Sequence, residues 1–223
     1  MKKILVLFIT AIIMTSGISA YAFFPKVPVG NAEPFDTTAL GNKQKRYLND
    51  YIGIVKELSE AYLLIAEAVI VDKEKDKTTA VIKSLQASNT ESDIKEIQKL
   101  TKNTSKEIDK ELKKAKDLDD NQKELLLKAT KPYLSANAKM ALLLTEIGVD
   151  SAIVGKAIAN NPTQALAIKD ELKTLLLLAN VLPGYSKMNI KTLDLLISTL
   201  EKNGVDMSKQ KKQKEEAQSQ GAE

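Results

Sequence analysis

The chain has 223 residues and a formal net charge of +4, and it contains no histidine, cysteine or tryptophan. Without histidine and cysteine it lacks the commonest general base, thiol chemistry, disulfides and lipid attachment at a cysteine. The small net charge gives no general attraction to nucleic acid, so we expect no specific nucleic-acid partner.

Residues 1–22 have the three parts of a secretory signal peptide. Lys2 and Lys3 precede a short apolar run, and Ala20 and Ala22 occupy the two positions that a signal peptidase recognises. The run is shorter than the roughly 20 apolar residues of a membrane-spanning helix. We therefore expect cleavage after Ala22 and a protein exported to the periplasm or secreted, with no transmembrane segment in the mature chain. Removing the two lysines lowers the net charge from +4 to +2.

Residues 23–37 form an apolar segment that contains Pro25, Pro28 and Pro34. Because proline interrupts helices and favours an extended residue before it, we predict an extended N-terminal arm here. The arm either lies across the surface of the folded body or docks on a partner, and the sequence leaves both alternatives open.

Residues 38–205 have helical periodicity throughout and no strand pattern, so we predict an all-α domain. It is expected to be a single helical bundle of about four long and two shorter helices. The charged segment 72–77 is predicted to be a solvated turn, and the polar tail 206–223 is predicted to be disordered. The predicted helices cover residues 38–71, 78–87, 91–118, 119–159, 162–182 and 186–203.

Several helix ends have recognisable signals. Asp119 and Gln122 form a predicted capping pair, and Pro132 is expected to kink or restart the helix that follows. Asn161-Pro162 predicts the start of the next helix, and Pro183-Gly184 predicts its end. Asn203-Gly204-Val205 predicts a C-terminal cap.

Six lysines of the predicted helix 91–118 recur at spacings of three and four residues. At 100° per residue they fall in a narrow arc opposite the apolar seam of the same helix. One interpretation is a solvated helix face. The other is a contact with phospholipid headgroups, an acidic envelope polymer or an acidic partner protein. The candidate residues for binding an anionic surface are Lys95, Lys99, Lys102, Lys106, Lys110 and Lys113.

The carboxylates give little support for catalysis or metal binding. Glu146 and Asp150 are one helical turn apart and are the best candidates for an acid–base pair, but such a pair more often marks the solvent edge of a helix. Asp117 and Asp119 begin like a calcium loop, but the sequence lacks the loop's later ligands, and helix capping explains them better. We therefore expect no catalytic residues, no metal and no cofactor.

The sequence thus favours an exported, non-enzymatic helical interaction, scaffold or accessory protein that contacts an anionic surface or an acidic partner through its lysines. The alternative is a membrane-active helical protein, resembling a toxin or pore-former, that opens over the apolar region 133–182. Charged residues within that region, such as Lys139, argue against deep insertion. The identity of a partner and the oligomeric state are left open.

Overall fold

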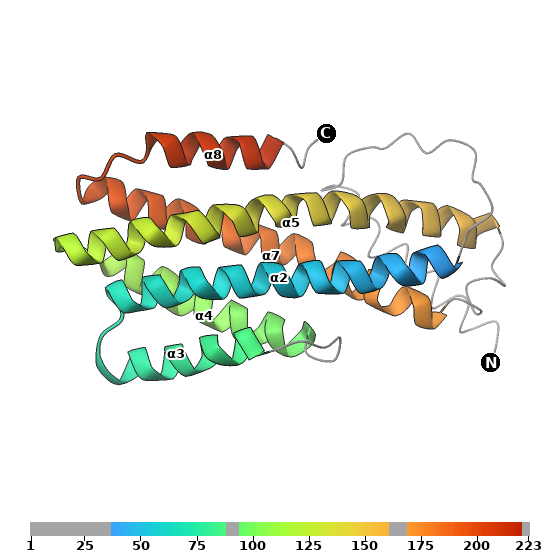
Figure 1. Ribbon diagram of the computed structural model, residues 1–223, viewed down its shortest axis with the longest axis horizontal. Helices are drawn as coiled ribbons and strands as arrows, with labels where there is room; N and C mark the ends of the chain where they lie inside the picture. The colour runs from blue at the N-terminus through green and yellow to red at the C-terminus, as the bar shows by residue number, and fades with distance from the viewer. Residues whose placement is uncertain (1–36, 88–93, 161–168, 220–223) are drawn as a thin grey trace.

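The computed structural model describes residues 37–87, 94–160 and 169–219, which form six α-helices and no strand. Figure 1 shows them as an elongated bundle. The predicted all-α fold class is therefore confirmed. The helices are α2 (Thr37–Val69), α3 (Asp72–Ala87), α4 (Ile94–Lys114), α5 (Asp120–Asn160), α7 (Lys169–Lys202) and α8 (Ser208–Ser219).

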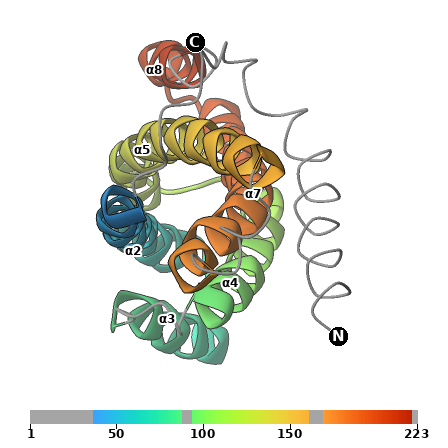
Figure 2. The ribbon, with the colours of Figure 1, turned by 90° about the vertical axis from the view of Figure 1, so that its right-hand side faces the viewer.

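The long helices α2, α4, α5 and α7 surround the core, and Figure 2 shows them end-on. α5 packs against both α2 and α7, and α4 packs against α7 and α2. The two shorter helices lie outside this group on opposite sides: α3 contacts α2 and α4, whereas α8 contacts α5. α4 and α8 are therefore on different sides of the bundle.

An apolar stripe along α2 lines the core. Tyr51, Val55, Leu58, Tyr62 and Ile65 are all at most 1% exposed. Their spacing of three and four residues places them on one side of α2, where each helical turn adds another buried side chain. Burial of this stripe against the neighbouring helices contributes to the apolar stabilisation of the bundle.

The predicted capping pair at the start of α5 is confirmed. The backbone N–H of Gln122 donates to the Asp119 carboxylate at 2.8 Å, and the backbone N–H of Asp119 donates to Gln122 Oε1 at 3.0 Å. Gln122 Nε2 also donates to the carbonyl oxygen of Ala68, near the end of α2. These two residues therefore fix both the start of α5 and its position beside α2.

The C-terminal cap predicted at Asn203-Gly204-Val205 is also present, at the end of α7. Gly204 has a φ of 83°, and the Val205 N–H donates to the Leu200 carbonyl at 3.0 Å. The Gly204 N–H donates to the Glu201 carbonyl at the same distance. This pair of bonds is a Schellman motif, in which glycine accommodates the left-handed conformation without strain.

The helix boundary predicted at Pro183-Gly184 is wrong, and so is a restart of the helix at Pro132. α5 continues through Pro132, and α7 continues through Pro183-Gly184, so the two helices predicted over 162–182 and 186–203 are one helix from Lys169 onwards. The buried face explains the continuity of α7, because Leu182 and Tyr185 lie on either side of Pro183 and are both at most 3% exposed. Packing on both sides outweighs the backbone hydrogen bond that proline removes.

Two other predicted boundaries also differ. α3 begins at Asp72, so the segment 72–77 is helical, and the turn is limited to Ile70 and Val71. Lysine and glutamate are good helix formers, and a charged sequence suits the exposed face of a helix as well as a turn. α4 ends at Lys114 instead of residue 118, shortly before Asp117 takes a φ of 52°.

The segment 206–223, expected to be a disordered tail, contains the helix α8. Asp206 caps this helix by accepting the Ser208 N–H at 2.9 Å, and Met207 beside it is 1% exposed. Lys211 pairs with Glu201 of α7 at 2.6 Å, and Lys214 pairs with Asp194 of the same helix. Capping and ion pairs thus hold a helix whose own sequence has little apolar surface.

Some predictions lie outside the described residues. These are the signal peptide 1–22, the arm 23–37 apart from Thr37, the start of the predicted helix 91–118, and the helix start at Asn161-Pro162. Thr37, the last residue assigned to the arm, is the first residue of α2.

We predict that Asp119→Ala lowers the free energy of unfolding by about 1 kcal/mol, because the Gln122 N–H loses its side-chain acceptor. Asp119→Ser is the matched control, since serine supplies a hydroxyl acceptor at the same position and should retain most of the stability. Urea unfolding followed by circular dichroism measures both variants. An equal loss in the two would contradict the assigned role of this cap.

Candidate anion-binding surface

The structure places all six predicted lysines on the exposed side of α4. We call Lys95, Lys99, Lys102, Lys106, Lys110 and Lys113 the lysine ridge, and each of them is exposed. At about 1.5 Å per residue the ridge is about 27 Å long. The opposite side of α4 is buried and contains Ile94, Ile97, Thr101, Thr104, Ser105, Ile108, Asp109 and Leu112.

Hydroxyl groups between α4 and α7 fix the rotation of α4 about its own axis. Thr192 of α7 donates to Asp109 Oδ1 at 2.6 Å, and Ser105 Oγ lies 2.8 Å from the same threonine oxygen. Farther along, Tyr185 Oη donates to Thr101 Oγ1 at 3.0 Å. Because these polar groups are buried, turning α4 would leave them without partners, which is costly. The ridge is thereby held towards solvent.

Asp109 is the acidic residue on the side of α4 that adjoins α7. Its side chain is 11% exposed, and besides the Thr192 bond it lies 3.4 Å from Lys191 Nζ of α7. Asp109 was not among the residues predicted to form a site. Its position in the sequence could have indicated this role, because it follows Ile108 beside the apolar seam of the helix. A carboxylate buried there needs a hydrogen-bond or ion-pair partner.

Buried tyrosines fill the centre of the bundle next to these hydroxyls. The rings of Tyr62 and Tyr133 meet edge to face with centroids 5.9 Å apart, and those of Tyr51 and Tyr185 do the same at 5.9 Å. Tyr62 Oη donates to Asn189 Oδ1 at 3.2 Å. Desolvation by burial raises the pKa of all four phenols. They are therefore neutral components of the core.

Two acidic residues of α4 pair with one lysine of the ridge and with Lys114 beside it. Lys110 Nζ lies 2.8 Å from Glu107 and 3.4 Å from Glu111, and Lys114 Nζ lies 2.7 Å from Glu111. The hydrogen bond with Glu107 raises the pKa of Lys110, and the bond from Lys114 lowers the pKa of Glu111. Such exposed pairs are weak and are screened by salt.

Five lysines of the ridge make no ion pair with any residue in the described part of the chain. They are Lys95, Lys99, Lys102, Lys106 and Lys113, and they are exposed along nearly the full length of α4. Ammonium groups on flexible stems attract anions without imposing the two-point geometry of arginine. The arrangement therefore suits a salt-sensitive contact with an extended negative surface.

The candidate acid–base pair is divided between two ion pairs with α2. Asp150 is buried and accepts hydrogen bonds from Lys43 Nζ at 2.9 Å and Tyr47 Oη at 2.7 Å. Glu146 pairs with Arg46, whose guanidinium lies 5.1 Å from the Tyr47 ring centroid. Both carboxylates are therefore engaged in the contact between α2 and α5.

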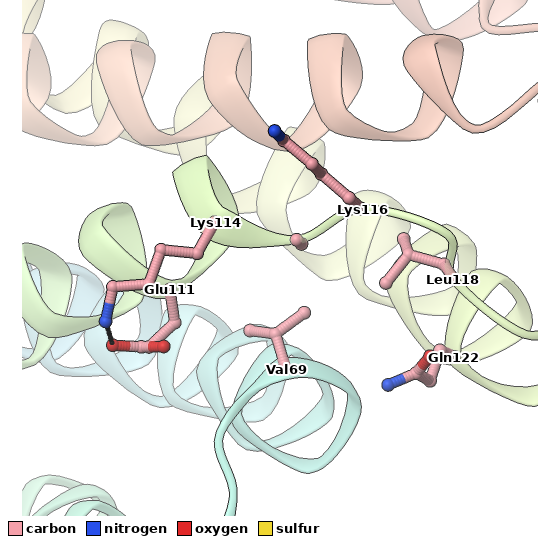
Figure 3. A pocket seen from close by; sticks show the side chains of 7 residues that line it. Val69, Glu111, Lys114, Lys116, Leu118 and Gln122 are labelled. Carbon is pink, nitrogen blue, oxygen red and sulfur yellow. Dashed lines mark hydrogen bonds and ion pairs between the residues drawn. The ribbon is translucent and has the colours of Figure 1, made fainter.

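A small cavity lies at the end of the bundle where α2, α4 and α5 meet (Figure 3). It has a volume of about 160 Å³, and three of its polar side chains already bond within the fold: Glu111 accepts Lys114 Nζ, and Gln122 donates to a backbone carbonyl. Within the described ranges, no group of three or more acidic side chains is placed to hold a metal ion. The other lining residues include Val69, Lys116 and Leu118.

The region 133–182, on which the membrane-active alternative depends, has polar contacts in its described part. Lys139 pairs with Glu57 of α2, and this joins the pairs of Glu146 and Asp150 with the same helix. Leu142, in the middle of this apolar region, is 49% exposed. Among the described helices, none has the length and apolarity needed to cross a membrane.

The fold and its exposed lysines place the protein in the class of all-α helical bundles with a basic surface helix. No protein-family model matches the chain, and no curated protein or solved structure matches it.

We predict that Thr192→Val lowers the free energy of unfolding by about 1–3 kcal/mol, because Asp109 and Ser105 lose their shared partner in a buried site. Thr130→Val is the matched control: Thr130 is also buried, but its hydroxyl donates only to the Leu127 carbonyl of its own helix. Its effect should be small. Urea unfolding that gives equal losses for both variants would contradict the role of the α4–α7 contact.

We also predict that the free energy of unfolding falls as the pH rises above about 10, the ordinary pKa of tyrosine. The folded protein keeps the buried phenols protonated while the unfolded chain ionises them, so deprotonation favours unfolding. Each such phenol contributes a slope of about 1.4 kcal/mol per pH unit. Tyr51 Oη has no hydrogen-bond partner among the described residues, so Tyr51→Phe should flatten this slope without lowering stability at neutral pH. A slope in the variant as steep as in the unaltered protein would contradict this account.

Proposed function

We propose that this protein is an exported, non-enzymatic interaction protein that contacts an anionic surface or an acidic partner through the lysine ridge. The observation that carries the proposal is the exposure of all six lysines on one side of α4, five of them without an ion-pair partner among the described residues. Like charges one turn apart are mildly unfavourable in a helix. A ligand that supplies negative charge offsets that repulsion.

The rest of the bundle supports a binding role more than a chemical one. The chain has no histidine or cysteine, and the acid–base candidates Glu146 and Asp150 are both held by cations of α2. Their oxygens already accept hydrogen bonds from Lys43 and Arg46 in the contact between α2 and α5. The bundle therefore acts as a rigid support that orients the ridge.

The chemistry of the ridge indicates how such binding should behave. Lysine ammonium groups are strongly hydrated point charges, and Arg46, the chain's single arginine, lies on α2 and not on α4. Binding should therefore depend on charge density more than on the detailed shape of the ligand. It should also weaken steeply with salt, because the Debye length falls from about 10 Å at 0.1 M to about 3 Å at 1 M.

We predict that replacing four ridge lysines with glutamine weakens binding to anionic vesicles or acidic polymers by about two orders of magnitude or more at low salt. The substitutions are Lys99→Gln, Lys102→Gln, Lys106→Gln and Lys110→Gln. Co-sedimentation over a range of salt concentrations measures the loss. Because these side chains are exposed, the variant should keep its circular-dichroism spectrum.

The matched control removes four exposed lysines from α5 and α8. Binding by this control should remain close to that of the unaltered protein, because its lysines lie on helices other than α4. Equal binding by the ridge variant and the unaltered protein would overturn the proposal, as would the absence of salt-sensitive binding to every anionic ligand tried. The control substitutions are Lys128→Gln, Lys131→Gln, Lys209→Gln and Lys212→Gln.

A further inference from the structure

α4 and α7 run side by side in the same direction. Three of the hydrogen bonds between them join residues separated by nearly constant intervals. The interval is 84 residues for Thr101 with Tyr185, 83 for Asp109 with Thr192, and 87 for the bond from Thr199 to α4. An interval that stays constant along both helices means that they are parallel. A residue of α7 therefore lies level with the α4 residue about 85 positions before it.

This register brings two lysines of α7 level with the centre of the ridge. Lys187 lies level with Lys102, and Lys191 lies level with Lys106. Both α7 lysines are exposed, and they are one helical turn apart on the same side of α7. The Lys191 side chain is 68% exposed, and its Nζ reaches Asp109 at 3.4 Å. This contact places Lys191 on the side of α7 that adjoins α4.

The acidic groups around these lysines are arranged unevenly. Glu107 and Glu111 pair with Lys110 and Lys114 on the flank of α4 away from Asp109. On the flank next to α7, Asp109 is the acid that α4 contributes, and it already accepts a hydrogen bond from Thr192.

On α7, Asp194 shares the exposed side with Lys187 and Lys191, and it pairs with Lys214 of α8. That acid is therefore already engaged. The positive charge is consequently concentrated along the line where α4 meets α7, and not at the middle of α4 alone.

We propose that a two-row lysine surface across α4 and α7 binds the phosphate headgroups of an anionic lipid membrane. This inference rests on the proposed function and specifies its partner. The first row is formed by four lysines of the ridge, and the second by the two lysines of α7. The surface consists of Lys95, Lys99, Lys102, Lys106, Lys187 and Lys191.

The shape of this surface favours a membrane over a single acidic chain. Packed helices lie about 8–10 Å apart, and the first row extends for about 17 Å along α4. Two adjacent rows form a broad patch, which a plane of headgroups contacts all at once, whereas a linear polymer follows one row. Clusters of four to eight lysines or arginines are typical of sites for anionic lipids.

The surroundings of the patch indicate contact without insertion. The large apolar side chains that are exposed in the described residues are Val71, Leu127 and Leu142, which belong to neither α4 nor α7. With no apolar anchor in the patch, binding stays at the level of the headgroups and is reversed by salt.

The test is co-sedimentation with vesicles that contain phosphatidylglycerol, compared with vesicles of phosphatidylcholine alone. Removing the second row with Lys187→Gln and Lys191→Gln should weaken binding to the anionic vesicles by about tenfold or more at low salt. The matched control is Lys209→Gln with Lys212→Gln on α8, which lies on a different side of the bundle from α4 (Figures 1 and 2). It should bind like the unaltered protein.

A second variant tests whether weaker binding results from the lost charge and not from altered packing of α4 on α7. Lys191 contacts Asp109, so its loss affects the contact between the helices as well as the surface charge. Lys187→Glu leaves that contact intact, and by reversing one charge of the second row it should also weaken binding by about tenfold. Circular dichroism of each variant should match that of the unaltered protein.

The outcomes separate this inference from the proposed function. If the variants of Lys187 and Lys191 bind anionic vesicles normally while the ridge variant does not, the two-row surface is overturned and the proposed function stands. Binding to polyglutamate or polyphosphate but not to anionic vesicles likewise overturns the two-row surface and leaves the proposed function standing. If the unaltered protein binds none of these ligands, both proposals fall.

Discussion

The rotation of α4 about its axis is the constraint on which the candidate surface depends. Its buried side carries isoleucines together with Thr101, Ser105 and Asp109, and these polar groups find their partners on α7. Burial of apolar side chains alone would tolerate small rotations of α4 about its axis, because the hydrophobic effect is non-directional. Hydrogen bonds do not tolerate them, since each has a narrow range of geometry. The polar contacts therefore specify which side of α4 faces solvent.

The bundle and the ridge were predictable because both follow from periodicity. α4 has a narrow apolar seam with lysines opposite, so the buried side could be assigned from spacing alone, and Ile97 and Ile108 are fully buried. The capping pair of Asp119 and Gln122 was likewise visible, since it depends on residues three positions apart. Local rules succeed where the interaction itself is local.

The remaining errors arise where tertiary contacts override local signals. Pro183-Gly184 is a strong stop signal, yet the buried face continues from Leu182 to Tyr185 without a change in spacing. That continuity could have been seen in the sequence, but the cost of an interior proline and the gain from packing cannot be compared without the neighbouring helices. The helix α8 was missed for the same reason, because its ion-pair partners Glu201 and Asp194 lie on another helix.

The parallel arrangement of α4 and α7 has a consequence for when the lysine surface exists. The two rows belong to segments more than eighty residues apart, joined only after the whole of α5 has returned along the bundle. In a chain whose synthesis has not reached α7, the lysines of α4 are present but the second row beside them is not. The two-row surface therefore forms late in folding, when α7 packs against α4. Unfolding separates the two rows although every lysine keeps its charge.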